Sequence, residues 1–424
     1  MKVIPSAMSH PLLHLSFALA LIPALLGTAR GASEEPNRSG RPQTTPRQVP
    51  GVVISHIPQA TGVFIGSPSL AILPDGHLVA SHDEFGPQST EFVRAATRVF
   101  RSSDRGQTWT QVARIEGQFW STLFAHRGAL YLLGTDRHHG NVIIRRSLDS
   151  GTTWTSPTSA VTGLLREQGE YHCAPVPVLE HAGRLWRAIE RRDPPRGWGI
   201  TYCAAMLSVP VGADLLDARH WTCSNFLPGD PKWLEGAFGG WLEGNAVVTR
   251  QGALLDLLRV DTAAGPEKAA LVSITPDGKR ASFSPETGFI NFPGGAKKFT
   301  IRYDDRSARY WSVTSVAPGK PASATPPASL RNTLALICSP NLKDWIVRTI
   351  LLWHPDSAMH GFQYVDWLFD GDDLVAACRT AFDDEAGGAH NYHDANFLTF
   401  HRWSHFRDLT WADGVQLSAE SSQP

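Results

Sequence analysis

A short motif that occurs twice in the first half of the chain constrains the fold more than any other feature. Its pattern is Ser-x-Asp-x-Gly-x-x-Trp, and the two copies run from Ser102 to Trp109 and from Ser147 to Trp154. In such a motif the Asp and Ser side chains hydrogen-bond the backbone of a turn, the Gly adopts a conformation that a Cβ disfavours, and the Trp packs the hairpin onto its sheet. Matching positions lie 45 residues apart, a period typical of four-stranded propeller blades. The motif therefore predicts repeated hairpins, and it says nothing about catalysis.

A looser phrase recurs along the rest of the chain: a tight turn, a Gly and then an apolar strand. It begins at Gly76, Gly128, Gly183 and Gly252, with a variant at Asp372 and a less regular copy over residues 310–316. No segment has a sustained helical period, and turn-forming residues separate the apolar runs. We therefore predict an all-β chain that forms a single β-propeller of four-stranded blades, six of which are readable. Residues 52–73 and 409–417 would complete a shared or a seventh blade by bringing the two ends of the chain together.

The start of the chain predicts export. Residues 1–32 combine a Lys, an apolar run and small residues near Ala29 and Ala32, which is typical of a signal peptide, and the run is too short and interrupted for a membrane span. Residues 33–50 predict a disordered linker, and residues 51–417 the propeller with its catalytic site. We expect a secreted or periplasmic monomer. A formal net charge of −1 argues against a surface for nucleic acid or for an anionic membrane.

The five cysteines show no spacing typical of a zinc site. Cys173, Cys203 and Cys223 are close enough in sequence for one disulfide, and buried thiols are the equal alternative. We expect that the protein requires no cofactor and binds no catalytic metal, with a structural divalent cation left open.

Charged residues follow the Gly phrase at a fixed distance. Seven positions after the Gly-like residue, five blades carry Asp83, Thr135, Glu190, Arg259 and Arg379. Equivalent strand ends in a propeller gather around one mouth of the central channel, so opposite charges would converge there and form a candidate site. The alternative is that they are ordinary solvated strand ends.

Segments outside the repeats resemble a family of glycan-degrading propellers. The segments are Ser81-His82-Asp83-Glu84, Glu170-Tyr171-His172-Cys173, Trp241-Leu242-Glu243-Gly244, Gln363-Tyr364-Val365-Asp366 and His393-Asp394-Ala395-Asn396. The double motif is identified as the Asp-box of sialidase-like propellers, and the chain from about residue 51 to 410 resembles the L-rhamnose-α-1,4-D-glucuronate lyases, also described as α-L-rhamnosidases of glycoside hydrolase family 145. This resemblance implies seven blades and one catalytic histidine near the start of the propeller, which corresponds to His82.

The resemblance implies a lyase that releases terminal L-rhamnose from α-1,4-linked D-glucuronate in arabinogalactan-type glycans, so an acidic saccharide is the expected partner. β-Elimination requires a base near neutral pH for the C5 proton and cations for the carboxylate. We expect His82 to be the base and Arg259 and Arg379 to bind the carboxylate. Asp83, Tyr171, His172 and Glu190 complete the predicted substrate-binding set.

Each of these assignments has an alternative. The two arginines can instead form ion pairs with Asp83 or Glu190, and Tyr171 and His172 can simply be buried. Hydrolysis by a rhamnosidase or sialidase-like enzyme would use two carboxylates from among Asp83, Glu190 and Glu243. A non-catalytic glycan-binding propeller is the third possibility.

A true sialidase is disfavoured by one segment. Sialidases carry an arginine in a Phe/Tyr-Arg-Ile-Pro motif, and the corresponding stretch here is Ile54-Ser55-His56-Ile57-Pro58. His56 cannot supply the permanent, bidentate charge of an arginine. Trp120, Trp198 and Trp367 are candidates for stacking a sugar or for filling blade interfaces, and His393, Asp394 and Asn396 predict a structural polar network.

Overall fold

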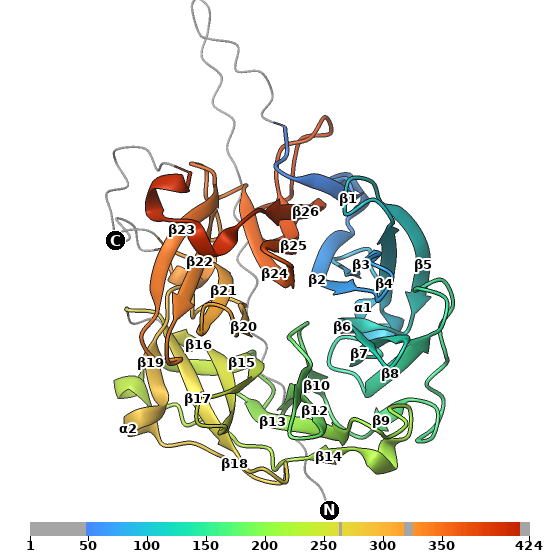
Figure 1. The fold of residues 1–424 in the computed structure, drawn as a ribbon, viewed down its shortest axis with the longest axis vertical. Helices are drawn as coiled ribbons and strands as arrows, with labels where there is room; N and C mark the ends of the chain where they lie inside the picture. The colour runs from blue at the N-terminus through green and yellow to red at the C-terminus, as the bar shows by residue number, and fades with distance from the viewer. Residues whose placement is uncertain (1–47, 263–264, 318–324, 416–424) are drawn as a thin grey trace, which may run out of the picture. The chain divides into compact units, whose positions relative to one another are not determined.

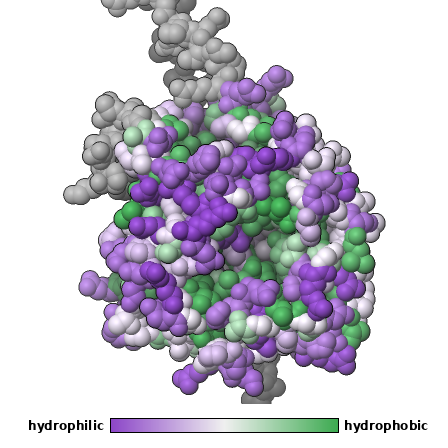
Figure 2. Space-filling model, in the orientation of Figure 1, coloured by the Kyte–Doolittle hydropathy of each residue, from purple (hydrophilic) through white to green (hydrophobic). Residues whose placement is uncertain are grey.

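The computed structural model describes residues 48–262, 265–317 and 325–415, which form six antiparallel sheets arranged as blades around a central axis (Figure 1). The predicted all-β, single-propeller fold is confirmed. The predicted signal peptide (1–32) and most of the predicted linker (33–50) lie outside the described residues. On the face shown in Figure 2, apolar residues gather toward a hollowed centre and hydrophilic residues cover much of the rim.

The first three blades follow one another along the chain. Blade 1 consists of β2 (Phe64–Ile72), β3 (Leu78–Phe85), β4 (Ala96–Ser102) and β5 (Thr110–Glu116), with the short helix α1 (Glu91–Arg94) between β3 and β4. Blade 2 consists of β6 (Phe119–His126), β7 (Ala129–Thr135), β8 (Val142–Ser147) and β9 (Leu164–Arg166). Blade 3 consists of β10 (Tyr171–His172), β11 (Leu179–His181), β12 (Arg184–Arg192), β13 (Tyr202–Pro210) and β14 (Thr222–Cys223), where β10 and β11 both pair with β12.

Blades 4 and 5 continue the order, and blade 6 joins the two ends of the described chain. Blade 4 consists of β15 (Phe238–Val248), β16 (Leu254–Thr262), β17 (Lys268–Ile274), β18 (Ala281–Ser282) and β19 (Phe289–Asn291), with helix α2 (Pro285–Gly288) before β19. Blade 5 consists of β20 (Thr300–Asp304), β21 (Arg309–Ser315), β22 (Thr333–Ser339) and β23 (Ile346–Trp353). Blade 6 consists of β24 (Gly361–Asp370), β25 (Asp373–Ala381), β26 (Phe397–Trp403) and β1 (Val52–His56). Single 3₁₀ turns lie at Gln59–Thr61, Ala218–His220, Leu234–Gly236, Pro327–Ser329, Phe406–Asp408 and Trp411–Asp413.

The expectation of seven blades is wrong, and the blade number is six. Residues 52–73 divide between two blades: β1 pairs with β26 as the outer strand of blade 6, and β2 begins blade 1. The described part of 409–417 contains a 3₁₀ turn and no strand. The terminal segments therefore close the ring without adding a blade. All six copies of the Gly phrase correspond to the second strands β3, β7, β12, β16, β21 and β25.

The Asp-boxes have the predicted local structure. Asp104 accepts hydrogen bonds from Ser102 Oγ (2.8 Å) and from the backbone N–H of Thr108 (2.9 Å), and Trp109 Nε1 donates to the Gly106 carbonyl (3.1 Å). Gly106 has φ 93°, and a Cβ there would lie 2.1 Å from the Phe400 ring. The second box repeats these contacts around Asp149, so both motifs stabilise turns between strands of a blade.

Large aromatic side chains pack the blades against one another. Trp241 and Trp367 are fully buried, and each indole N–H donates to a carbonyl of the preceding blade, at Tyr202 (3.0 Å) and Thr300 (2.9 Å) respectively. Trp367 therefore belongs to a blade interface and has no access to a sugar. Truncating such a side chain costs about 3–5 kcal/mol.

The five cysteines are free thiols, and all but Cys223 are buried. No disulfide joins Cys173, Cys203 and Cys223, so the buried-thiol alternative describes the structure. Neither described α-helix is long and apolar enough to cross a membrane.

Candidate functional site

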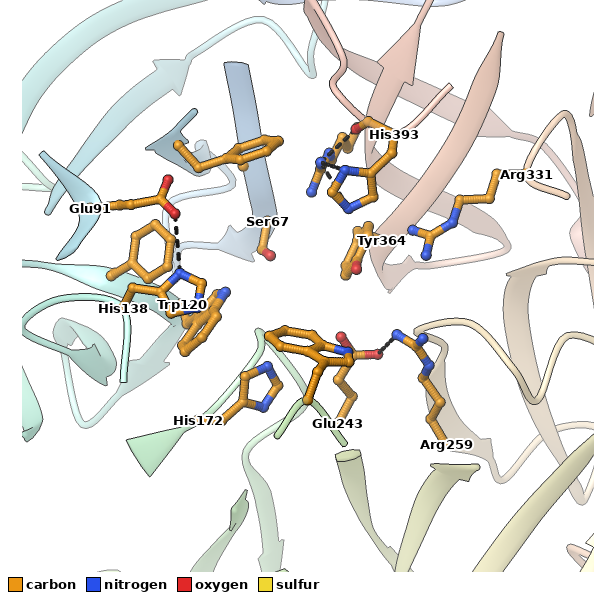
Figure 3. Close-up of a pocket in the computed structure, with 15 residues that line it drawn as sticks. Ser67, Glu91, Trp120, His138, His172, Glu243, Arg259, Arg331, Tyr364 and His393 are labelled. Carbon is orange, nitrogen blue, oxygen red and sulfur yellow. Dashed lines mark hydrogen bonds and ion pairs between the residues drawn. The ribbon is translucent and has the colours of Figure 1, made fainter. Parts of the chain in front are cut away.

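A cavity of about 320 Å³ lies where the blades converge, and every blade contributes to its wall (Figure 3). Trp120 and His138 lie on one side, and the arginines lie on the other with Tyr364 and His393 (Figure 3). Its lining residues are Gly66, Ser67, Phe85, Glu91, Phe119, Trp120, His138, His172, Trp198, Glu243, Arg259, Arg331, Tyr364, Arg379 and His393.

Three lining side chains project from identical distortions of the innermost strands. The strand pairing shifts register between Phe119 and Thr122 in β6, between Leu242 and Asn245 in β15, and between Gln363 and Asp366 in β24. Within these bulges Trp120, Glu243 and Tyr364 have φ values of 47°, 60° and 54°. Bulky residues rarely adopt this conformation, and bulges re-aim side chains near functional sites. The distortions therefore direct these three side chains into the cavity.

Buried carboxyl groups support two of the bulges from the neighbouring blade. Asp83 accepts a hydrogen bond from the Trp120 N–H (2.9 Å), and Glu190 accepts one from the Gly244 N–H (3.1 Å). Burial raises the pKa of Asp83 to about 8, so the group is protonated at neutral pH. The hydroxyl of Thr97 lies 2.8 Å from both Asp83 Oδ1 and the Gln118 carbonyl. A protonated Asp83 can donate to Thr97, which then donates onward to that carbonyl.

His172 forms a buried pair with Glu190. The distance between His172 Nδ1 and a Glu190 carboxylate oxygen is 2.7 Å, and both side chains are 1% exposed. His172 lines the cavity, and its ring lies 4.3 Å from the ring of Trp120. Because the carboxylate orients the imidazole, this pair can hold or move a proton at the cavity wall.

A second carboxylate–imidazole pair lies on the blade 1 side. Glu91 Oε1 is 3.2 Å from His138 Nδ1, and Glu91 Oε2 accepts hydrogen bonds from the Gly86 N–H (2.8 Å) and Ser89 Oγ (3.1 Å). Sequence reasoning did not identify Glu91, because α1 lies in an insertion that has no position in the blade repeat.

The arginines differ in how their charge is balanced. Arg259 bonds to Glu243 (3.0 Å) and to Asp261 (2.8 Å); burial opposes its charge, but these carboxylates outweigh burial and raise its pKa. Arg331 and Arg379 form no ion pair with any residue that the structure describes. Arg379 Nη2 donates to the His393 carbonyl, and its buried Nε has no partner among the described residues.

Arg331 and Arg379 both pack on Tyr364. Their guanidinium carbons lie 5.1 and 4.9 Å from the centre of the Tyr364 ring. Arg331 otherwise donates to the side-chain oxygen of Gln363 and to the Ala328 carbonyl. Burial lowers the pKa of Arg379 to about 10, which leaves it charged at neutral pH. The cavity therefore holds two buried guanidinium groups that form no ion pair with a carboxylate of the described residues, and Asp394 acts on Arg379 only at longer range.

The structure brings most of the predicted residues to this cavity. His172, Arg259 and Arg379 line it, and Asp83 and Glu190 lie directly behind its wall. Neither arginine pairs with Asp83 or Glu190, so the predicted alternative of such ion pairs does not describe the structure. Tyr171 lies in the core cluster of blades 2 and 3, away from the lining.

His82 is placed differently from the other predicted residues. It is fully buried, does not line the cavity, and lies between the Asp83 carbonyl (2.9 Å) and Ser55 Oγ (3.1 Å). Its ring stacks on Phe100, and burial lowers its pKa to about 4. A base at this position would need a route for substrate that the described cavity does not provide.

The segment that disfavoured a sialidase does not reach the cavity. His56 lies on β1, the outermost strand of blade 6, where it bonds to Asp384 (2.7 Å) and stacks on Phe397. The lining residues Gly66 and Ser67 come instead from β2. The absence of an arginine at position 56 therefore gives no information about which residues line the cavity. His393 lines it and bonds to Asp394 (2.8 Å), so the predicted polar network extends to the cavity wall.

Two buried cationic side chains bond to the backbone beside the bulges. Lys298 donates to the Val365 carbonyl (2.8 Å) and Thr300 Oγ1 (2.8 Å), and Arg187 Nη2 donates to the Cys173 carbonyl (2.8 Å). Both cations are at most 2% exposed. Within the described ranges no group of three or more His, Cys, Asp or Glu residues is arranged to hold a metal ion.

No family model matches the chain, and no curated protein sequence matches it. Among solved structures, the chain is similar to the Hadza microbial sialidase Hz136, with TM-score 0.58 and 13% identity over 84% of this chain and 69% of that one. It is similar to the Penicillium chrysogenum α-L-arabinanase complexed with arabinobiose, with TM-score 0.52 and 13% identity over 85% and 98%. It is also similar to the leech intramolecular trans-sialidase complexed with 2,7-anhydro-Neu5Ac, with TM-score 0.52 and 13% identity over 86% and 71%. The chain has the fold of the sialidase and arabinanase propellers.

Proposed function

We propose that the protein is an exo-acting glycoside hydrolase that removes a terminal sugar carrying a carboxylate. The observation behind this proposal is the pair of buried guanidinium groups, Arg331 and Arg379, which lack a carboxylate partner in the described chain and face one cavity. A buried, unpaired charge is expensive, and a bidentate carboxylate is the ligand that a guanidinium fits best.

The size of the cavity supports exo action. A volume of about 320 Å³ is at the lower end of small-molecule sites and suits one terminal sugar.

The cavity also holds the groups that hydrolysis requires. Glu91 and Glu243 lie on opposite sides, and Tyr364 lies on the side of Glu243 (Figure 3). Glycosidases usually pair a general acid with a base or nucleophile, and a tyrosine replaces the carboxylate nucleophile in sialidases. In our proposal Tyr364 attacks the anomeric carbon, Glu243 accepts the phenol proton, and Glu91 protonates the leaving oxygen. Glu91 then takes a proton from water, which displaces Tyr364 from the anomeric carbon, and Glu243 returns the proton to the phenolate.

The structural neighbours support a carbohydrate substrate, since they are an arabinanase, a sialidase and a trans-sialidase. The two unbalanced arginines favour an acidic sugar over a neutral arabinose.

Elimination at a uronate is the second candidate, and the His172–Glu190 pair favours it. If a 4-linked glucuronate binds with its carboxylate at Arg331 and Arg379, His172 is the lining imidazole that a fully buried carboxylate orients to take the C5 proton. The rhamnosyl-glucuronate lyase expected from the resemblance would then use His172 in place of His82.

A panel of substrates separates these proposals. The purified protein is incubated with the 4-methylumbelliferyl glycosides of α-N-acetylneuraminic acid, β-D-glucuronic acid and α-L-arabinofuranose, and with gum arabic. Release of an acidic sugar, with loss of release in Arg331→Gln and Arg379→Gln, supports the hydrolase. Rhamnose release with an unsaturated uronate chromophore supports the lyase. Turnover of the neutral arabinoside alone would overturn both.

A further inference from the structure

Two large aromatic side chains are exposed beside the cavity. Phe92 on α1 is 67% exposed, and Trp198 in the loop between β12 and β13 is 49% exposed. Large exposed apolar side chains beside a pocket are typical of binding surfaces. Trp198 itself lines the cavity, whereas Phe92 follows the lining residue Glu91.

Ring contacts join these exposed residues to the cavity wall. Phe92 stacks on His138 with 4.6 Å between ring centres, and His138 lies 4.5 Å from Trp120 and 6.4 Å from Trp198. Trp120 is only 7% exposed. The series therefore runs from the protein surface to the interior of the cavity, and we call Phe92, His138 and Trp198 the aromatic ledge.

The ledge lies across the cavity from the arginines. Figure 3 shows His138 and Trp120 on one side, and Arg331 and Tyr364 on the other. No ledge residue carries a permanent charge, and Glu91, the acid proposed for the leaving oxygen, bonds to His138 (3.2 Å). A group that departs from the terminal sugar at Glu91 would therefore leave over the ledge.

We propose that the aromatic ledge is the binding subsite for the neutral sugar next to the acidic one, and that Phe92 and Trp198 set the preference for this leaving group. The proposal rests on the proposed hydrolase. The apolar face of a neutral pyranose packs on aromatic rings, and burying that face covers apolar surface that the free protein leaves exposed. An acidic second sugar is excluded as the favoured occupant because the ledge provides no cation.

The test compares two leaving groups on one acidic sugar. Initial rates are measured with the methyl glycoside and the lactose-linked glycoside of N-acetylneuraminic acid or glucuronic acid, whichever the substrate panel shows to be released. In Phe92→Ala and Trp198→Ala, kcat/KM for the lactose-linked substrate should fall about tenfold more than kcat/KM for the methyl glycoside. Phe92→Tyr should restore the wild-type ratio of kcat/KM for the lactose-linked substrate to kcat/KM for the methyl glycoside.

Val93→Ala is the matched control, because Val93 is the next residue on α1, is 80% exposed and belongs to no ring contact of the ledge. Its ratio should equal that of the wild type. Equal losses on both substrates in Phe92→Ala and Trp198→Ala, or no loss, would overturn the subsite while leaving the hydrolase standing. Failure of the wild-type protein to release an acidic sugar from any substrate of the panel would overturn the hydrolase and the subsite with it.

Discussion

The backbone N–H of Trp120 donates a hydrogen bond to the buried carboxyl of Asp83 across the boundary between blades 1 and 2 (2.9 Å). The same relationship recurs between the Gly244 N–H and Glu190 across blades 3 and 4 (3.1 Å). In both cases a second-strand acid supports the left-handed bulge of the next blade. These acids therefore act as positioning residues for Trp120 and Glu243, because they fix the backbone from which those side chains project.

Asp83→Asn should change how stability depends on pH. The pKa of Asp83 is about 8 in the folded protein and 3.8 as an ordinary carboxyl, so between pH 4 and 8 the unfolded chain releases a proton that the folded protein keeps. This group thus makes the protein less stable as pH rises through that window. Asparagine can donate to Thr97 and accept from Trp120 without titrating. We measure the free energy of unfolding with urea at pH 5 and at pH 7.5. From the lower to the higher pH, the value for the variant should rise relative to the wild type by at least about 1 kcal/mol.

Asp75→Asn is the control for that measurement, since Asp75 lies in an exposed turn. Its stability should follow the wild-type pH dependence. If the stability of Asp83→Asn depended on pH in the same way as that of the wild type, Asp83 would be ionised in the folded protein.

His82→Ala should reduce stability and spare turnover per folded molecule. His82 is fully buried with two hydrogen-bond partners, so its loss leaves a cavity and an unpaired Ser55 hydroxyl, at a cost of about 2 kcal/mol or more. Because its folded pKa is about 4 against 6.5 for a free imidazole, it also destabilises the wild type as pH falls from 6.5 toward 4. Thermal unfolding measures the loss of stability, and active-site titration gives the turnover per folded molecule. Normal stability with abolished turnover would restore His82 as the catalytic base.

Glu190→Gln should impair the cavity without unfolding the protein. Glutamine can still accept from the Gly244 N–H, but its amide N–H replaces the carboxylate oxygen that faces His172 Nδ1. Replacing a carboxylate that orients a functional imidazole typically lowers activity ten- to a hundredfold. We expect kcat/KM to fall by about that factor and the pH profile of turnover to shift. Glu180→Gln, in an exposed position of the same blade, should leave both unchanged.

Arg379→Met should raise stability and abolish binding of acidic sugars. Burial already lowers the pKa of Arg379 to about 10, and its charge has no carboxylate partner in the described chain. Replacing it with an apolar side chain of similar length removes a desolvated cation, which we expect to stabilise the free protein by about 1 kcal/mol. Calorimetric titration with the acidic sugar and thermal unfolding measure the two effects. Arg250→Met, on an exposed turn, should change neither.

Tyr364→Phe should abolish hydrolysis while retaining binding. The substitution keeps the ring on which Arg331 and Arg379 pack and removes the hydroxyl proposed to attack the anomeric carbon. We expect turnover to fall by about 10³-fold or more with little change in affinity for the acidic sugar. Tyr303→Phe removes an exposed tyrosine hydroxyl and serves as the control. Retained turnover in Tyr364→Phe would transfer the role of nucleophile to Glu243.

The repeats made the blades predictable. Asp104 and Asp149 fix two turns by local chemistry, and each Gly phrase marks a second strand, so the readable repeats alone gave six blades. The resemblance added a seventh, which the structure does not contain. Whether residues 52–73 form a new blade or complete an old one depends on which strand pairs with β26, and this long-range pairing leaves no local signal.

The site was predictable where it follows the repeat register. Counting from the Gly phrase located Arg259 and Arg379 in the cavity and Glu190 behind it. Glu91 and Arg331 lie in connections outside the strands, and the cavity-facing role of Tyr364 depends on a bulge that a two-residue strand period cannot reveal. The role expected of His82 came from the resemblance, which does not show whether a polar residue on a second strand faces the channel or a blade interface.

Blade 6 joins the first described strand to the last one, and the same blade carries Tyr364, Arg379 and His393. During synthesis β1 emerges before blade 1 but has to wait for β26 before it can pair. The earlier blades can fold while translation continues, whereas the blade that carries Tyr364, the proposed nucleophile, and Arg379 is completed last. A chain that ends within blade 6, before β26, therefore has five complete blades and an incomplete candidate site.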